Sequence, residues 1–336
     1  VENLYARFGE TGPNFCFAGH TDVVPPGDEA AWTEPPFEAN LRDGFLWGRG
    51  AVDMKGAIAA FVAAAAGIVR AETPPPGSIS LLITGDEEGP AIDGTKKLLE
   101  AVVADGEKID HCLVGEPTCK NELGDTVKVG RRGSLNGVIT VTGRQGHVAY
   151  PDAAENPIPA LLELLARLMA RPLDDGAQHF QPSNLEITSI DVSNPAHNVI
   201  PARASAKLNI RFNPKHTGAA LEKWIEAEAA STMLGFKVDI ALDLHTTGEA
   251  FLTPDGPFTE LLADAVEAET GARPGLSTGG GTSDARFITN YAPVAELGLV
   301  GTTMHKVDEH APVEEIRKLQ AIYAKVLALY FERFAA

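Results

Sequence analysis

Short apolar runs alternate with helical spacings in the first part of the chain. Three runs have the length of a β-strand, at residues 14–19, 78–85 and 111–115. Two helical patterns lie between them, at residues 55–71 and 95–104. Strands and helices that alternate in this way predict an α/β fold with a mixed, mostly parallel sheet covered by helices.

The pattern changes near Arg131. From there the chain predicts a strand, a helix, two strands, a helix and a strand, at residues 135–143, 156–169, 184–192, 203–212, 217–230 and 236–242. This order is typical of a ferredoxin-like α+β unit. The first style returns after Pro254, with helices at residues 256–269 and 312–334 and a strand at residues 293–297.

These patterns divide the chain into two domains. The larger α/β domain is discontinuous, with residues 1–132 and 248–336, and the smaller domain is inserted at residues 133–247. A chain of 336 residues is long enough for both, because a domain commonly has about 150 residues. The sequence begins at Val1 and not at a methionine, so we expect an N-terminal part of the larger domain to be missing.

Charge and cysteine content narrow the possible partners and location. Lys and Arg number 28 against 46 Asp and Glu, a formal net charge of −18, which argues against nucleic-acid binding. The apolar stretch at residues 56–69 is shorter than the about 20 residues of a membrane span, so we expect a buried helix. No secretory signal is visible, and Cys16, Cys112 and Cys119 form no disulfide framework. We therefore expect a cytoplasmic protein.

Histidine and acidic residues follow the predicted strands, which is where open α/β sheets bind their ligands. His20 and Asp22 come directly after the first strand, and the period of two places them on the same side if the chain stays extended. Asp22 could fix the tautomer of a metal-binding His20. A His-x-Asp pair is equally what a structural histidine beside a carboxylate would show.

Five further residues extend this set. Asp53 opens a predicted helix, where it can also be an ordinary N-cap, and Glu87 and Glu88 lie in an acidic turn after the second strand. Glu116 follows the third strand, and His305 comes after a glycine-rich stretch. Without Asp22 the set has two histidines and four acidic residues and no thiolate, which suits a hydrolytic zinc pair with one bridging carboxylate and another left free as a base.

Long motifs resemble the dizinc aminoacylase and carboxypeptidase family, of the peptidase M20 type. The metal-site motifs are GHTDVVPPGD at residues 19–28, WGRGAVDMKG at 47–56, GDEEG at 85–89 and GEPT at 115–118. A narrower resemblance rests on GHVAYP at residues 146–151, AENP at 154–157, NVIPA at 198–202 and STGGGTSDARF at 277–287. The resemblance runs over nearly the whole chain.

The resemblance implies a zinc-dependent amide hydrolase with two Zn²⁺ ions, for which Co²⁺ could substitute. His20 and Glu116 would bind one ion, Glu88 and His305 the other, and Asp53 would bridge them. It also implies a cis peptide bond after Asp53. The larger domain would then carry the catalytic site, and the inserted domain would serve as a lid and as a dimerisation domain.

The resemblance also assigns catalytic roles. Glu87 would be the general base that takes a proton from the attacking water and gives it to the departing amine. Asp22 would support the site beside His20. His147, on the inserted domain, would reach the active site of the partner subunit and stabilise the oxyanion, so we expect a homodimer.

The narrower resemblance implies a small-molecule substrate, N-succinyl-LL-2,6-diaminopimelate. Its hydrolysis would yield succinate and LL-2,6-diaminopimelate for lysine and peptidoglycan synthesis. The substrate carries three carboxylates, and six residues match positions suited to holding them: Arg131, Ser134, Tyr150, Asn198, Arg211 and Thr282. As alternatives to substrate contacts, these residues could be solvated strand arginines, hydroxyls at the edge of a core, and a turn asparagine.

Several other functions stay open on the sequence. A deacylase of the same fold, such as an acetylornithine deacetylase or an aminoacylase, would share the metal motifs. A metal-binding or ligand-binding homologue without catalysis is a further alternative, although the free base Glu87 beside Glu88 argues against it. A serine hydrolase around residues 281–284 is disfavoured, because the stretch lacks a GxSxG elbow.

Overall fold

The computed structural model describes residues 1–71 and 75–335. Its chain divides into two compact units. Unit 1 comprises Val1–Gly130, Leu252–Thr278 and Ser283–Ala336, and unit 2 comprises Arg131–Phe251 and Gly279–Thr282. The chain passes between them at β8 (Gly130–Arg131) and β15 (Phe251–Leu252), which pair with each other as a two-stranded sheet.

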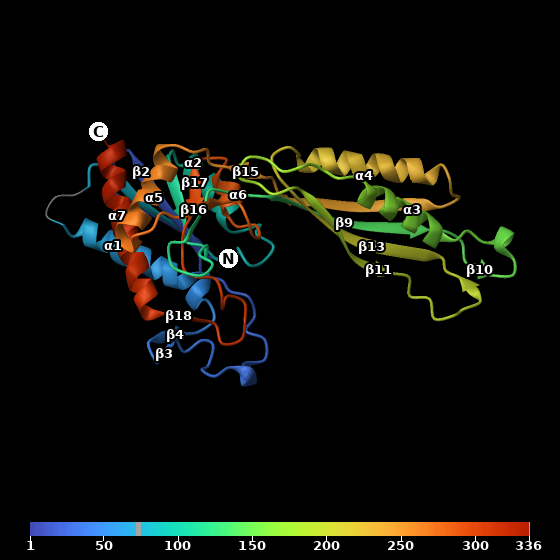
Figure 1. Ribbon diagram of the computed structural model, residues 1–336, viewed down its shortest axis with the longest axis horizontal. Helices are drawn as coiled ribbons and strands as arrows, with labels where there is room; N and C mark the ends of the chain where they lie inside the picture. Colours follow the sequence, from blue (N-terminus) through green and yellow to red (C-terminus); the bar gives the residue numbers. More distant parts are fainter. Residues whose placement is uncertain (72–74, 336) are drawn as a thin grey trace. The chain divides into compact units, whose positions relative to one another are not determined.

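Unit 1 is built on a seven-stranded sheet (Figure 1). In spatial order its strands are β1 (Leu4–Phe8), β5 (Ser78–Thr84), β2 (Asn14–His20), β6 (His111–Val114), β17 (Val294–Glu296), β7 (Thr126–Lys128) and β16 (Gly275–Ser277). The four strands β5, β2, β6 and β17 run parallel to one another. At the two ends of this group, β1 is antiparallel to β5 and β7 is antiparallel to β17. The expected mixed, mostly parallel α/β sheet is confirmed.

Within residues 1–71 and 75–335, five α-helices belong to unit 1. They are α1 (Gly56–Val69), α2 (Thr95–Ala104), α5 (Pro257–Thr270), α6 (Ala285–Ile288) and α7 (Val313–Phe334). The long α7 packs against both α1 and α5 (Figure 1). Phe61 of α1 stacks on Phe17 of β2, with ring centroids 4.2 Å apart, and contacts Tyr323 of α7.

The apolar segment that contains α1 is a core element. By length and composition alone, Ala51–Val69 is long and apolar enough to cross a membrane. In the structure, however, Ala57 and Phe61 are fully buried inside unit 1. Burial against the sheet accounts for the apolar composition of this helix without a membrane, as the sequence predicted.

A small second sheet lies beside the start of α1. It contains β3 (Asn40–Arg42), β4 (Phe45–Trp47) and β18 (His310–Pro312). Trp47 and His310 lie opposite each other in the ladder, and their rings stack at 4.5 Å. This sheet joins the chain just before residue 48 to the chain just after residue 309, so two loops distant in sequence are held side by side.

Unit 2 is an antiparallel sheet with two helices. The strands are ordered β11 (Asn184–Asp191), β13 (Arg203–Phe212), β9 (Gly133–Thr142) and β14 (Asp239–Gly248), and the helices are α3 (Pro157–Ala170) and α4 (Gly218–Met233). Both helices pack on one face of the sheet, over an apolar core that includes Leu135, Ile139, Leu164, Leu208 and Ile225. A separate two-stranded antiparallel sheet at the tip of this unit pairs β10 (Gly146–His147) with β12 (Val199–Ile200).

The last strand of unit 2 differs from the sequence prediction. The prediction placed it at residues 236–242, whereas β14 extends to Gly248 and begins at Asp239. The polar residues after Leu242 are held in the strand by pairing with β9, up to Gly248 opposite Ser134. A ladder with a long neighbour thus extends a strand past its apolar run.

Candidate active site

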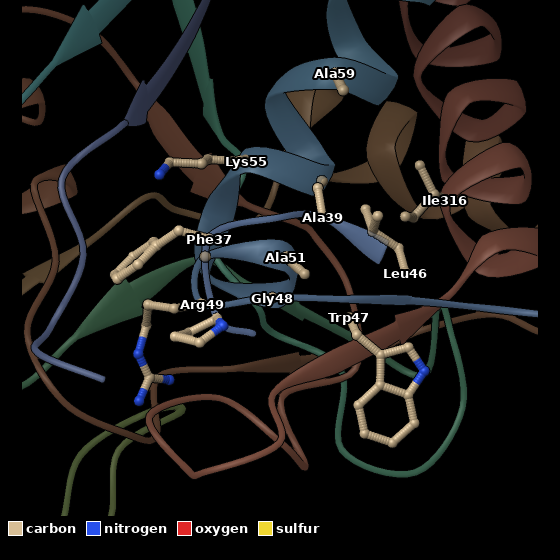
Figure 2. Close-up of a pocket in the computed structure, with 13 residues that line it drawn as sticks. Phe37, Ala39, Leu46, Trp47, Gly48, Arg49, Ala51, Lys55, Ala59 and Ile316 are labelled. Carbon is tan, nitrogen blue, oxygen red and sulfur yellow. The ribbon is translucent and has the colours of Figure 1, made fainter. Parts of the chain in front are cut away.

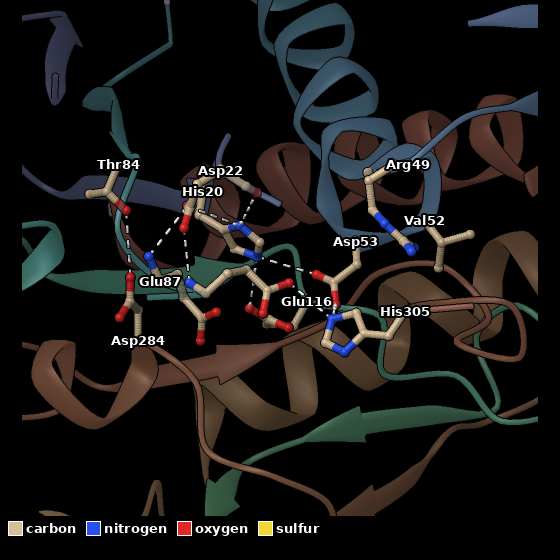
Figure 3. A network of polar contacts seen from close by, with 12 residues as sticks. His20, Asp22, Arg49, Val52, Asp53, Thr84, Glu87, Glu116, Asp284 and His305 are labelled. Atoms are coloured by element: carbon tan, nitrogen blue, oxygen red, sulfur yellow. Dashed lines mark hydrogen bonds and ion pairs between the residues drawn. The ribbon is translucent and has the colours of Figure 1, made fainter. Parts of the chain in front are cut away.

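The candidate metal ligands come from loops at one edge of the unit 1 sheet (Figure 3). His20 ends β2, the turn with Glu87 and Glu88 follows β5, and Glu116 follows β6. Since β5, β2 and β6 are neighbouring parallel strands, their carboxyl ends meet at this edge. Two loops complete the group, with Asp53 in the turn Ala51–Lys55 before α1 and His305 before β18.

Asp53 lies between the two histidines. Its Oδ1 is 3.2 Å from Nε2 of His20, and its Oδ2 is 3.1 Å from Nε2 of His305. Nε2 of His20 is also 3.6 Å from Oε1 of Glu116, and Nε2 of His305 is 2.9 Å from Oε1 of Glu88. The peptide bond after Asp53 is cis, as the resemblance implied. All five proposed metal ligands therefore meet around one carboxylate.

The site fits a pair of cations. Ligand atoms of His20, Asp53 and Glu88 lie within 4.8 Å of one another, and so do those of His20, Glu87 and Glu116. Oε1 of Glu116 is buried and has no hydrogen-bond partner among the described residues. Burial, together with Asp53 and Glu87, raises the pKa of Glu116 well above its usual value. Crowded carboxylates with an unsatisfied buried oxygen are compensated by bound divalent cations.

Protons on the two histidines can also compensate the negative charge of the carboxylates. Burial alone would lower the pKa of His20, but hydrogen bonds with Asp22 and Asp53 raise it to about 12. The hydrogen bond with Asp53 likewise raises the pKa of His305 to about 9. Metal binding requires neutral imidazoles, so cations that occupy the site would replace these protons.

Glu87 has the properties of a general base. Burial raises its pKa to about 7; His20 opposes this rise and Asp284 adds to it. A carboxyl group that titrates near neutral pH can both accept and deliver a proton. Glu88, next to it, also has a raised pKa because of burial and the charge of Asp53, and contacts His305.

Asp22 connects the two parts of the site. Its carboxylate accepts hydrogen bonds from the backbone amides of Glu87, at 3.3 Å, and Glu88, at 2.9 Å. Nδ1 of His20 lies 3.0 Å from the carbonyl oxygen of Asp22 and 3.5 Å from Oδ1. Asp22 therefore fixes the ring of His20 and the turn that carries both glutamates, and it does so from outside the ligand group.

Two buried acidic residues near the site were missed by sequence reasoning. Asp284 accepts a 2.6 Å hydrogen bond from the hydroxyl of Thr95 and influences the pKa of Glu87. Glu309 is fully buried and pairs with Arg49 at 2.6 Å. Their sequence signal is weak, because an acidic residue four positions after His305 is unremarkable until its partners are known.

The candidate substrate contacts all lie in unit 2, in two groups. His147, Tyr150 and Asn198 gather at the exposed tip formed by the β10–β12 sheet, where the ring centroids of His147 and Tyr150 are 5.9 Å apart. At the other end of β9, Ser134 lies opposite Arg211 in the ladder. Arg131 and Thr282 join this second group, because Nη1 of Arg131 donates to the Gly281 carbonyl at 2.8 Å.

The second group is rich in cations. Nη1 of Arg132 donates to Oδ1 of Asn184 at 2.9 Å, and Asn184 lies opposite Arg211 in the ladder, so the two arginines come from adjoining positions of the sheet. Burial lowers the pKa of Arg211, and burial together with the charge of Arg211 lowers that of Arg132. Ser134 is buried, and its hydroxyl accepts a 3.2 Å hydrogen bond from Asn209. Arginines that repel each other in a partly buried place are suited to binding carboxylates.

Known proteins are similar to this chain over most of its length. The model of peptidase family M20/M25/M40 matches residues 16–329. A protein named succinyl-diaminopimelate desuccinylase from Maricaulis maris is 66% identical over 336 residues, which is 100% of this chain and 86% of that protein. A protein of the same name from Caulobacter vibrioides is 61% identical over 335 residues, 100% of this chain and 86% of the relative.

Solved structures share the fold at low identity. A metallo-carboxypeptidase of the M20 family from Sulfolobus solfataricus superposes with a TM-score of 0.79 at 16% identity, over 98% of this chain and 88% of that chain. A dinuclear metal-binding peptidase of the M20 family from Bacillus subtilis gives a TM-score of 0.74 at 18% identity, over 98% and 85% of the two chains.

Proposed function

Because the chain belongs to peptidase family M20/M25/M40, we propose that it hydrolyses N-succinyl-LL-2,6-diaminopimelate to succinate and LL-2,6-diaminopimelate. The observation that carries this proposal is the name shared by relatives that are 56–66% identical over nearly the whole chain. The site agrees with the reaction, since the carboxyl group of Glu87, which would act as the base, lies beside the group of candidate metal ligands. The reaction would serve diaminopimelate and lysine biosynthesis.

The metal ions of the proposal are two Zn²⁺. His20 and Glu116 would hold one ion, Glu88 and His305 the other, and Asp53 both. The contacts of Asp53 with both histidines support this assignment. When bound, the ions supply Lewis acidity, which polarises the amide carbonyl and makes water more acidic. Co²⁺ has similar ligand preferences and could take their place.

Glu87 carries the proton in the proposed reaction. Its carboxylate takes a proton from water as the oxygen attacks the amide carbonyl carbon, and it gives that proton to the amine nitrogen as the C–N bond breaks. A pKa raised to about 7 by burial suits both steps. Asp22 holds the backbone at Glu87, and so helps to orient its side chain, by accepting a hydrogen bond from the Glu87 amide.

The substrate carboxylates would bind the second group of unit 2. Arg131 and Arg211 are the charged members, and Ser134 and Thr282 would add hydroxyl donors. Tyr150 and Asn198 would contact the substrate from the tip formed by the β10–β12 sheet, together with His147. A guanidinium group pairs with a carboxylate through two parallel hydrogen bonds, which explains a preference for an acyl group that ends in a carboxylate.

The separation of the two groups supports a homodimer. His147 and the Arg211 group lie at opposite ends of β9, roughly 25 Å apart for eight residues of strand. One copy of unit 2 cannot bring both to one small substrate, so His147 would come from the partner subunit. An exposed apolar stripe offers an interface, with Leu162 and Met169 on α3 and Ile190 on the edge strand β11.

We place the protein in the cytoplasm. Cys16, Cys112 and Cys119 are free and buried, which is usual for a protein of a reducing compartment. The substrate would be a small metabolite, and the formal charge of −18 disfavours nucleic-acid partners.

The test is a comparison of substrates. Zinc-loaded protein is assayed with N-succinyl-LL-2,6-diaminopimelate and with N-acetylornithine, and kcat/KM is expected to favour the succinyl substrate by at least about 100-fold. A preference for N-acetylornithine would overturn the acyl specificity. Two bound zinc ions without activity on either substrate would overturn the reaction.

A further inference from the structure

One buried glutamate holds the loop that carries Asp53. Glu309 is fully buried, and its Oε1 accepts hydrogen bonds from three backbone amides of that loop. The donors are the backbone amides of Gly50 at 3.1 Å, Val52 at 2.9 Å and Asp53 at 3.1 Å. Amides that converge on a charged oxygen form bonds roughly twice as strong as neutral ones, so this carboxylate fixes the backbone at Asp53 itself.

Arg49 fixes the carboxylate in turn. Its Nη1 donates to Oε2 of Glu309 at 2.6 Å, and both side chains are nearly inaccessible to solvent. The guanidinium group lies 5.2 Å from the centre of the Trp32 ring and donates to the carbonyl oxygen of Pro25 at 3.4 Å. The buried charge of Glu309 is therefore paired within the same loop that it holds.

A cavity borders the other side of this loop. It has a volume of about 360 Å³ and lies against Gly48, Gly50 and Ala51, with Leu46 and Ile316 on its apolar wall (Figure 2). Open space beside a backbone segment gives that side few van der Waals contacts. The hydrogen bonds of Glu309 therefore help to restrain the loop there, together with backbone hydrogen bonds such as the one from the Arg49 amide to the Pro36 carbonyl oxygen at 2.8 Å.

The turn that carries Glu309 also carries His305, four residues earlier in the chain. His305 and Asp308 both have left-handed backbone conformations, with φ of 61° and 62°, which non-glycine residues adopt rarely. Asp308 accepts hydrogen bonds from the amide of Thr33 at 2.6 Å and from its hydroxyl at 2.8 Å. The turn from His305 to Glu309 is therefore tied at its end to two other loops.

We propose that Glu309 is a positioning residue that sets the separation of Asp53 and His305 and thereby the affinity for the metal ion they share. It contacts neither substrate nor metal, and it acts by joining the loop of one ligand to the turn of the other. This inference rests on the proposed function, because it takes Asp53 and His305 as metal ligands.

The test is a calorimetric zinc titration of metal-free, full-length protein. Wild type is expected to bind two equivalents. Glu309→Gln is expected to bind one equivalent with affinity reduced about 10- to 100-fold, the usual effect of losing a group that orients a metal ligand, and the other with little change. Activity of the variant is expected to be low at limiting zinc and to recover at excess zinc.

A control at a partly exposed Arg–Glu pair separates this effect from the loss of an ion pair elsewhere in the unit. Arg7 and Glu107 form a 2.5 Å ion pair in the same unit, remote in sequence from the metal ligands. Glu107→Gln is expected to leave both zinc affinities unchanged. Equal losses in Glu107→Gln and Glu309→Gln would overturn the proposal, since the effect would then be general destabilisation.

A second variant deals with folding. Glu309→Gln leaves the Arg49 charge buried and unpaired, which by itself destabilises. The double variant Arg49→Met/Glu309→Gln removes both charges and is expected to recover thermal stability while zinc affinity stays reduced. Full recovery of zinc affinity in the double variant would overturn the positioning role.

The failure of this inference differs from failure of the proposed function. If wild type binds fewer than two zinc equivalents, the assignment of the metal pair is wrong. If wild type binds two and Glu309→Gln binds both with wild-type affinity, the metal pair stands and the role of Glu309 is wrong.

Discussion

The candidate metal site in unit 1 and the candidate substrate contacts in unit 2 are built in different ways. In unit 1, His20 and Asp53 are buried and lie within hydrogen-bond distance, on loops tied by further carboxylates. In unit 2, His147 and Tyr150 are exposed at the tip formed by the β10–β12 sheet, whereas Arg211 lies at the other end of β9, opposite Ser134.

The difference indicates where each property of the enzyme resides. A preorganised group in a dry place suits metal binding and proton transfer, because it needs no rearrangement during the reaction. Exposed groups at separate ends of a sheet suit a site that is completed only when two copies meet around a substrate. Unit 1 would thus determine the chemistry, and unit 2 the acyl group that is accepted.

The largest effect is expected at Glu87. Glu87→Ala removes the proton carrier, so kcat is expected to fall about 10³- to 10⁴-fold. Both zinc equivalents should remain when the metal content is measured by mass spectrometry of the purified protein. Loss of one zinc would instead make Glu87 a ligand, as its proximity to His20 and Glu116 also permits.

The next effect is expected at the tip of unit 2. His147→Ala is expected to lower kcat about 10²- to 10³-fold by removing one stabilising group from the developing oxyanion. Zinc content and thermal stability should not change, because His147 is exposed and, among the described residues, its ring accepts a hydrogen bond only from the nearby amide of Ala149. Unchanged kcat in steady-state assays would remove His147 from the reaction.

A smaller effect is expected at the arginine group. Arg211→Met is expected to raise KM for the succinyl substrate about 10- to 100-fold through the loss of hydrogen bonds to a charged group. Arg203→Met is the matched control, since Arg203 lies on the same strand and donates to Thr140 at 3.2 Å. Equal KM values for the two variants would place the substrate carboxylate elsewhere.

The smallest effect on catalysis is expected at Asp174. Burial alone would raise the pKa of Asp174. Hydrogen bonds from Ser183, Gly176 and Asn213 instead hold this pKa below its usual range. Asp174→Asn is expected to reduce stability by about 1–3 kcal/mol at neutral pH, with kcat nearly unchanged. Asp175→Asn, at an exposed neighbour, serves as the control.

The pH dependence of this effect has a definite sign. A carboxyl group with a depressed pKa in the folded state stabilises above its unfolded pKa, about 3.9, and loses this contribution as pH falls further. Chemical denaturation at pH 7 and at pH 3.5 should therefore show a larger gap between wild type and Asp174→Asn at pH 7. A gap that widens in acid would contradict the account.

Much of unit 1 follows from local sequence. The runs that form β2, β5 and β6 are long and apolar because both faces of the strands are buried, and the polar residues after them mark the site. Short strands such as β7 and β16, with three residues each, carry no periodic signal and exist because neighbours pair with them.

Contacts between distant segments account for what was missed. Glu309 lies 256 to 260 positions from its partners, and three of those partners are backbone amides that leave no trace in side-chain identity. His147 and Arg211 were found only through resemblance to a family, since one sequence shows no pairing between copies. The sequence predicts well which chemical groups lie at the strand ends. It predicts poorly the tertiary contacts that orient those groups.

Complementation between two inactive variants tests most directly whether His147 acts in the active site of the partner subunit. Glu87→Ala and His147→Ala proteins are mixed under conditions that exchange subunits, and hydrolysis of the succinyl substrate is measured. With His147 supplied by the partner, half of the dimers are mixed and each has one intact site, so activity should return to about a quarter of wild type. If His147 serves its own subunit, no mixed dimer has an intact site, and a mixture as inactive as its components would contradict the account.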